Sequence, residues 1–155
     1  MRLEGQRLLP AHRERAWDAL TDPLVLQSAI PGCESFAPAG PDVYTIVLAA
    51  ALGPVKARFR GRIALEDVVA HERYRLRFEG EGAAAGFARG EAHVALHDAT
   101  DGTRLDFEIQ AQVGGRIAQV GNRLVEPAAR KFVDQFFDAF CARLDERSGC
   151  ATPAR

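Results

Sequence analysis

Apolar and polar residues alternate through the middle of the chain, with the period of two that a half-buried β-strand requires. The stretch VKARFRGRIAL, residues 55–65, places its apolar side chains on one phase and its lysine and arginines on the other. Between residues 34 and 113 about six such strands are separated by turn signals, which lie at residues 39–42, 52–54, 70–72, 83–86 and 101–102. Because one phase is apolar and the other polar, we expect an antiparallel sheet that is covered on one face only.

The segments before this sheet predict a strand and two short helices. Residues 2–9 form the strand, which Pro10 ends because proline has no N–H for the ladder. Residues 11–30 predict the two helices, the second opened by Asp22 as its N-cap and Pro23 at its first helical position.

The last long segment predicts a helix from Arg116 to about Arg147, kinked at Pro127. Its apolar stripe consists of Ile117, Val120, Leu124, Phe132, Phe136, Phe140 and Leu144. The order of these elements predicts an α+β helix-grip fold. In this fold a curved antiparallel sheet of about seven strands wraps around a long C-terminal helix.

Length and composition fit one domain over residues 1–147, followed by a frayed tail at 148–155. The net charge of −1 gives no overall attraction to nucleic acid, and we expect no nucleic-acid partner. The three cysteines, Cys33, Cys141 and Cys150, lack the even count and the spacing of a disulfide framework or a zinc site. The sequence has no signal-peptide core and no stretch of about 20 apolar residues, so we expect a cytoplasmic protein.

Four stretches resemble a known family. They are DPLVLQSAIPGCES, GPVKARFRG, GAAAGFARGEAHV and AQVGGRIAQVGNRLVEPAARKFVDQFF. The chain is similar over residues 1–146 to the CoxG family of carbon monoxide dehydrogenase accessory proteins, within the START and Bet v 1-like (SRPBCC) group of hydrophobic-ligand-binding proteins.

The resemblance implies a non-catalytic accessory role. Family members are expected to recruit a molybdenum-containing carbon monoxide dehydrogenase-type hydroxylase to the inner face of the cytoplasmic membrane, where electrons pass to quinone. Longer members carry a C-terminal extension that ends in an apolar anchor, which this sequence lacks. We therefore expect peripheral membrane contact or ligand carriage rather than stable attachment.

Apolar side chains of the sheet and of the long helix form the candidate ligand site. The predicted lining residues are Phe36, Phe59, Phe78, Phe87, Phe107, Ile109, Val120, Leu124, Phe132 and Phe136. A bent sheet over one helix leaves room for a ligand, and nine phenylalanines against one tryptophan and two tyrosines favour a quinone or a lipid, bound without a covalent cofactor. The alternative is that these side chains only pack the core.

Two other features have functional and structural interpretations. The small residues of 80–86 predict either a close approach of two backbones, as in a bulged hairpin, or a mobile gate. The basic residues of 56–62 and 73–77 predict either a cationic docking face or exposed cross-strand pairs with acidic residues such as Glu66, Glu91 and Asp106.

Enzyme chemistry has little support in the sequence, and we expect no catalytic residue and no metal. His93 and His97 fall on the polar phase of their strand, and no serine or cysteine lies in a nucleophile motif. We expect no ionisable residue on the inward phase of the strands. Two alternatives stay open: an enzyme of the same fold, cyclase- or hydrolase-like, acting on an apolar substrate, and a protein-only adaptor without a ligand.

Overall fold

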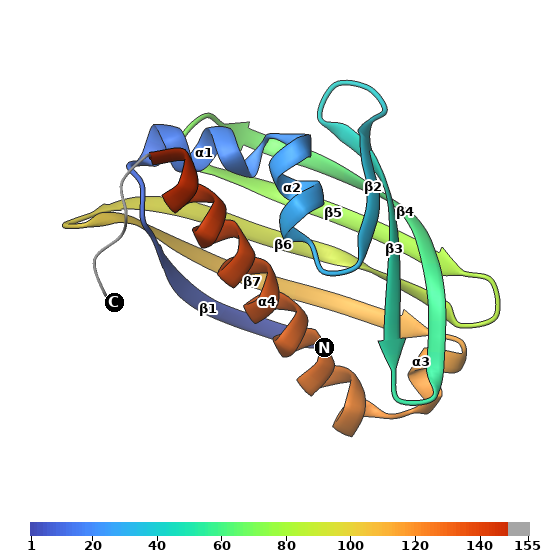
Figure 1. Ribbon diagram of the computed structural model, residues 1–155. Coiled ribbons are helices and arrows are strands. Elements are labelled where there is room, and N and C mark those ends of the chain that lie inside the picture. The colour runs from blue at the N-terminus through green and yellow to red at the C-terminus, as the bar shows by residue number, and fades with distance from the viewer. Residues whose placement is uncertain (149–155) are drawn as a thin grey trace.

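The computed structural model describes residues 1–148 as one curved sheet with helices on its inner side (Figure 1). The strands are β1 (Arg2–Leu9), β2 (Cys33–Pro38), β3 (Val43–Leu52), β4 (Val55–Val69), β5 (Arg73–Gly82), β6 (Gly86–Ala99) and β7 (Gly102–Gly114). The helices are α1 (Arg13–Leu20), α2 (Pro23–Ala29), α3 (Arg116–Gln119) and α4 (Asn122–Ser148). The predicted helix-grip fold is confirmed. Of the tail predicted at 148–155, Ser148 is the last residue of α4, and residues 149–155 lie outside the described residues.

The sheet has seven strands in the order β1-β7-β6-β5-β4-β3-β2, and each neighbouring pair is antiparallel. It curls around α4, as Figure 1 shows. Two glycines permit this curvature: a Cβ atom on Gly61 would lie 2.2 Å from the carbonyl oxygen of Glu79, and one on Gly90 would lie 2.0 Å from that of Gln110. Only glycine allows neighbouring strands to approach so closely.

The second short helix begins where the sequence predicts. The carboxylate of Asp22 accepts a hydrogen bond from the backbone N–H of Leu24 at 2.9 Å, and Pro23 opens α2. Trp17 and Leu20 of α1 and Val25 of α2 are buried in the main core. These helices therefore close one end of the sheet's inner side.

The C-terminal helix differs from the prediction of one continuous helix kinked at Pro127. The chain instead leaves the helical conformation at Gly121, whose φ is +84°, and α4 then continues across Pro127. Because the break rotates the second helix, Val125 is buried whereas Leu124 is 48% exposed. The predicted apolar stripe is thus correct at Ile117, Phe140 and Leu144, which are buried, and wrong at Leu124.

Apolar packing occurs in two separate clusters. The larger one joins α1, α2 and the C-terminal half of α4 to β1, β5, β6 and β7, with Phe140 and Leu144 fully buried at its centre. The smaller cluster lies at the other end, where Val55, Ala85 and Ile117 pack together. Both ends of the inner side are therefore filled, and the space between them is the region of interest.

Candidate functional site

Between the two clusters, glycine and alanine occupy several positions on the inner face of the sheet. Cross-strand neighbours there form two rows: Phe36, Ile46, Gly61, Gly80, Ala88 and Val113 in one, and Tyr44, Ile63, Phe78, Gly90 and Ala111 in the other. Glycine and alanine occupy the middle of the first row and one end of the second, where larger side chains would otherwise reach α4. The sequence therefore leaves space above the curved part of the sheet.

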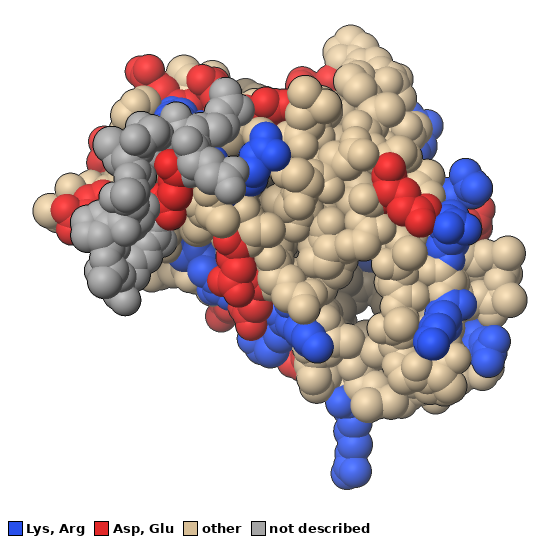
Figure 2. All heavy atoms as spheres, viewed as in Figure 1, with Lys and Arg blue, Asp and Glu red and all other residues tan. Residues whose placement is uncertain are grey.

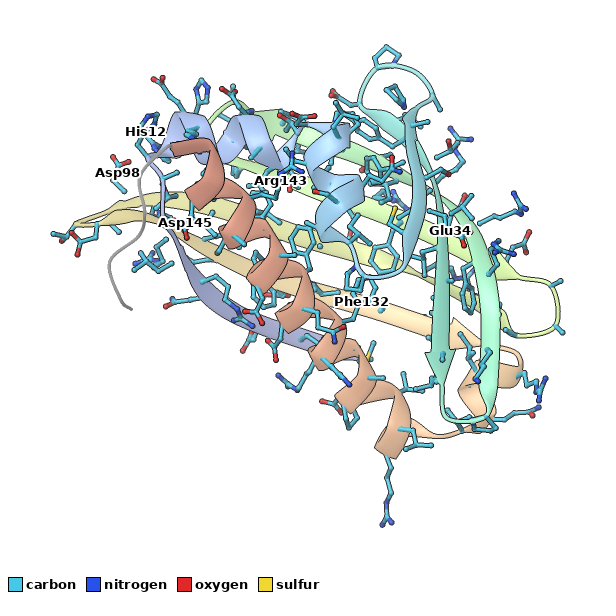
Figure 3. All side chains as sticks on the ribbon, in the orientation of Figure 1. His12, Glu34, Asp98, Phe132, Arg143 and Asp145 are labelled. Carbon is cyan, nitrogen blue, oxygen red and sulfur yellow. The ribbon has the colours of Figure 1, made fainter. Side chains whose placement is uncertain are left out.

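The part of α4 that faces these rows also carries small side chains. Ala128 and Ala129 precede Phe132, which is the first phenylalanine of α4. Figure 2 shows a hollow between α4 and β3, and Figure 3 shows Phe132 projecting from α4 toward this gap. Ile63 and Phe78 on the sheet are half-buried rather than buried, as expected for residues that border open space.

Most of the predicted lining residues lie on this inner side. Phe36 is 6% and Phe107 is 8% exposed, whereas Phe59, Phe78, Ile109, Val120 and Phe136 are half-buried. Phe132 is 36% exposed at the hollow. Phe107 and Phe136 pack against the main core and Phe59 and Val120 against the smaller cluster, so the structure divides these residues between the two ends.

Two predicted lining residues lie away from the inner side of the sheet. Phe87 lies on the outer phase of β6, the phase of Arg89 and Glu91, and the guanidinium of Arg89 lies 5.2 Å from its ring centroid. Leu124 is exposed next to the turn between β3 and β4, where its Cδ1 atom lies 3.6 Å from the Cβ position of Gly53.

The sequence reasoning missed several inner residues. Phe137 is 7% exposed and stacks on Phe107 with a centroid distance of 5.6 Å, although it lies outside the predicted stripe. Val125 was missed because the break at Gly121 changes the helix phase. Tyr44, which lies opposite Ile63 on the inward phase of β3, was also missed, and alternation along the strand was the signal that could have found it.

The expectation of no ionisable residue on the inward phase is wrong for Arg7. Arg7 shares the phase of the buried residues Leu3 and Leu9, and its guanidinium binds the carboxylate of Asp134 on α4. The same guanidinium lies 5.4 Å from the ring centroid of Phe107 and 5.3 Å from that of Phe137. Arg7 therefore closes the gap between β1 and α4, on the side of the helix away from β3.

The two tyrosines are the other polar groups to note on the inner face. Burial raises the pKa of Tyr74, which is 7% exposed, and a charge on Tyr44 would raise it further. Burial also raises the pKa of the Tyr44 hydroxyl, with contributions from Asp42 and Asp22. Both hydroxyls therefore stay protonated and available as donors at neutral pH.

The small-residue hairpin between β5 and β6 closes one end of the hollow. The backbone N–H of Ile117 donates to the carbonyl oxygen of Ala85 at 2.7 Å, and Ala85 is 2% exposed. A Cβ atom on Gly86 would lie 2.1 Å from the carbonyl oxygen of Gly114. Of the two interpretations of this segment, the structure shows the close approach of backbones.

The outer face of the sheet is charged, and Arg58, Arg73, Arg75 and Arg77 of its basic strands each lie within 4 Å of a carboxylate. The guanidinium of Arg75 lies 2.7 Å from the carboxylate of Glu66 and 3.8 Å from that of Glu91, and Arg58 binds Glu34 at 2.6 Å. These pairs support the structural interpretation of the basic strands, although exposed ion pairs of this kind contribute little to stability. Two concavities, of about 950 and 640 Å³, also lie on this face.

The histidines and cysteines form no recognisable reactive group within the described chain. His97 lies 3.2 Å from Asp106 on the outer face, and burial raises the pKa of the Cys33 thiol, which makes it a weaker nucleophile. Within residues 1–148, no three His, Cys, Asp or Glu side chains come together as a metal site. In the same part of the chain no helix is long and apolar enough to cross a membrane.

These features define a helix-grip protein with an apolar hollow between its sheet and its long helix. The family model of CoxG, a subunit of carbon monoxide dehydrogenase, matches residues 5–145, and the chain belongs to this family. No curated protein matches the chain.

Solved structures from several bacteria share the fold. A conserved protein from Geobacillus kaustophilus is 28% identical with a TM-score of 0.89, and the match covers 94% of this chain and 96% of that one. A protein from Thermus thermophilus is 19% identical with a TM-score of 0.71, covering 96% and 99%. The Zhui aromatase/cyclase from a Streptomyces species is 11% identical with a TM-score of 0.66, covering 96% of each chain. The last two similarities show the fold alone.

Proposed function

We propose that this protein is a non-catalytic accessory protein that carries an apolar ligand, a quinone or a lipid, in the hollow between the sheet and α4. It recruits a molybdenum-containing carbon monoxide dehydrogenase-type hydroxylase to the cytoplasmic membrane. The observation that carries the proposal is the hollow itself, bordered by the half-buried side chains of Ile63, Phe78 and Phe132. The family name supports the partner.

The chemistry of the hollow favours an apolar occupant. Its floor consists of aliphatic, aromatic and glycine residues, and Arg7, the cation on the inward phase of β1, is already paired with Asp134. Burying apolar ligand surface there contributes roughly 25 cal/mol per Å². A quinone ring or an acyl chain gains this free energy, whereas a sugar or a nucleotide would lose hydrogen bonds to water without replacement.

The end of the molecule beside the hollow suits contact with an anionic membrane. Ala49, Ala50 and Ala51 are exposed at the end of β3, close to the exposed side chain of Leu124. Exposed basic residues surround this apolar end: Lys56, Arg60, Arg116 and Arg123. Figure 2 shows such basic side chains beside the hollow. Apolar contact and attraction to anionic headgroups act together in peripheral membrane binding.

Ligand carriage is tested by native mass spectrometry and solvent extraction of the purified protein, followed by equilibrium dialysis with menadione, a small quinone. We expect a co-purified apolar molecule and saturable binding of one menadione per chain. A protein that is empty and takes up no quinone or fatty acid would overturn the proposal.

Membrane contact is tested with vesicles of phosphatidylcholine and phosphatidylglycerol. Leu124→Glu places a negative charge in the first turn of α4, where the helix tolerates it, and should abolish sedimentation with the vesicles. Leu24→Glu is the matched control, because Leu24 is also exposed in the first turn of a helix, at 75%. Equal vesicle binding by both variants would exclude the apolar end as the contact.

Recruitment of the hydroxylase is tested by co-sedimentation of the purified enzyme with the same vesicles. The enzyme should sediment only when this protein is present, and the Leu124→Glu variant should fail to bring it down. Vesicle binding of the enzyme that does not depend on this protein would remove recruitment from the proposal.

The two alternatives from the sequence have weaker support. An enzyme of the same fold is represented among the structural neighbours by the aromatase/cyclase, but this likeness extends to the fold alone. A protein-only adaptor has no use for a hollow flanked by Ala128, Ala129, Gly80 and Gly90, where larger side chains would give a better-packed core.

A further inference from the structure

The N-terminal part of α4, residues 122–132, borders the hollow but has little packing of its own. Of these residues only Val125 is buried. Within the described chain neither apolar cluster has a member between residues 121 and 132, and the residues that α4 gives to the main cluster begin at Val133. Because apolar burial supplies most of the stability of a helix in a protein, this part of α4 is held less firmly than the rest.

The polar contacts of α4 divide the helix at the same place. In residues 122–132 the ion pair between Arg130 and Glu126, at 3.7 Å, lies within the helix itself. No side chain of this segment makes a hydrogen bond or an ion pair to another element of residues 1–148. The later part of α4 is tied by side chains to β1, α2 and α1, through the pairs Arg7–Asp134, Ser28–Arg143 and Arg15–Leu144.

Two residues allow this segment to move. Gly121 has a φ of +84°, and a Cβ atom built on it would have no other atom within 4 Å, so open space surrounds a residue of high conformational freedom. Before this point α3 is anchored, because Ile117 is buried and its N–H donates to Ala85. Within the segment, Pro127 has no N–H for the carbonyl oxygen of Arg123, which removes one hydrogen bond of the helix. Residues 122–132 therefore form a lid that can move about Gly121 and Pro127.

The contact between this lid and the sheet lies at the end proposed to meet the membrane. The Cδ1 atom of Leu124 lies 3.6 Å from the Cβ position of Gly53, in the turn between β3 and β4. Leu124 is 48% exposed, so much of its apolar surface is still in water. The same side chain therefore contributes both to the closure of the lid and to the membrane-contacting surface.

We propose that contact with an anionic membrane opens this lid: Leu124 leaves the β3–β4 turn for the acyl chains, and the mouth of the hollow between α4 and β3 (Figure 2) widens. This inference rests on the proposed ligand carriage and adds its regulation. A binding partner favours the state to which it binds more tightly. With the lid closed the turn covers part of Leu124, whereas with the lid open the whole side chain can enter the bilayer. The membrane therefore favours the open state.

The test measures how fast the full chain, loaded with menadione, releases it into excess cyclodextrin. Release is followed by the recovery of fluorescence of Trp17, the single tryptophan, with and without vesicles of phosphatidylcholine and phosphatidylglycerol. The mixed vesicles should accelerate release about tenfold, the factor that corresponds to burying half of a leucine side chain. Vesicles of phosphatidylcholine alone are the matched control and should leave the rate nearly unchanged.

A cross-link between the lid and the turn tests the moving part. The double variant Gly53→Cys/Leu124→Cys is bridged with dibromobimane, a short thiol cross-linker, and each single variant treated with the same reagent is its control. The bridged protein should retain menadione during the time in which the single variants release it, and mixed vesicles should not restore release. All three variants are made in a chain in which serine replaces Cys33, Cys141 and Cys150.

Pro127→Ala tests the same motion without a cross-link. Alanine restores an N–H to the helix and should slow release about threefold, the effect of one added hydrogen bond. Pro41→Ala is the control, because Pro41 is also exposed but lies in the loop between β2 and β3, away from the lid.

The outcomes separate the lid from ligand carriage. If menadione binds but neither the cross-link nor Pro127→Ala slows its release, or if the mixed vesicles do not accelerate release, the proposed opening is wrong while carriage stands. If the wild type binds no menadione, carriage and its regulation both fail.

Discussion

The stability of two phenylalanine variants of α4 tests whether the hollow exists in solution. Phe140 is fully buried in the main core and stacks on Phe136 with a centroid distance of 5.6 Å. Phe132 lies two turns earlier, is 36% exposed and projects toward the hollow. The same substitution, phenylalanine to alanine, therefore removes a core residue in one variant and a residue beside open space in the other.

The two variants should differ in how much free energy of unfolding they lose. Phe140→Ala loses the transfer free energy of the ring and leaves a cavity in packed surroundings, which together cost about 3–5 kcal/mol. Phe132→Ala opens no new cavity, because the ring already borders the hollow, and part of its surface is in water. Only a reduced transfer term is lost, about 1–2 kcal/mol, and alanine's higher helix propensity offsets part of that.

Urea denaturation followed by circular dichroism measures both values. We expect Phe140→Ala to lower the unfolding midpoint strongly and Phe132→Ala to lower it slightly, while menadione binding weakens in Phe132→Ala. Equal losses of stability would refute the reasoning, because Phe132 would then be packed as a core residue and the hollow would be closed in solution.

Two further predictions concern the sheet. Gly90→Ala should destabilise the protein by about 3 kcal/mol or more, because the new Cβ would lie 2.0 Å from the carbonyl oxygen of Gln110. Gly80→Ala should cost no more than about 1 kcal/mol, because the atom nearest to its new Cβ lies 3.5 Å away. Similar urea midpoints for the two would contradict this. Arg58 lowers the pKa of the exposed Glu34 below its ordinary 4.5, so this pair stabilises the fold above that pH and the benefit is lost as the pH falls. The urea midpoints of wild type and Glu34→Gln should therefore differ at pH 7 and converge as the pH falls through the lowered pKa of Glu34; a constant difference would count against the pair.

Local sequence signals were sufficient to predict most of the strands and helices of the fold. The first strand was predicted as residues 2–9 and is observed as Arg2–Leu9, since Pro10 gives a definite end. The N-cap and first-position pair Asp22-Pro23 set the start of α2. These features depend on one or two neighbouring residues and on strand periodicity, so the sequence contains them completely.

The phase of the C-terminal helix could not be obtained in this way. Counting a stripe across Gly121 assumes helical dihedral angles there, but the residue has a φ of +84°. A position counted from α3 into the first turn of α4 is then out of phase, which explains why Leu124 was chosen instead of Val125, whereas Phe140 and Leu144 are buried as predicted. A glycine within a helical pattern can either continue the helix or end it in the left-handed conformation, and the pattern of apolar residues does not decide between the two.

Phe87 was misplaced although the sequence held a usable signal. Phe87, Arg89, Glu91 and His93 share one phase of β6, and three of the four are charged or polar. The turn before Phe87 consists of small residues without alternation, so the phase has to be read from the residues that follow. The hollow itself depends on glycines and alanines from different elements meeting across space, which no single segment reveals.

Isotope-filtered nuclear Overhauser effects between bound menadione and ¹³C-labelled alanine methyl groups test ligand carriage most directly. The inner side offers Ala88, Ala128 and Ala129, whereas Ala64 and Ala95 line the two concavities of the outer face. We predict contacts to the first group and none to the second. Contacts confined to Ala64 or Ala95 would place the ligand on the charged outer face and contradict carriage between the sheet and α4.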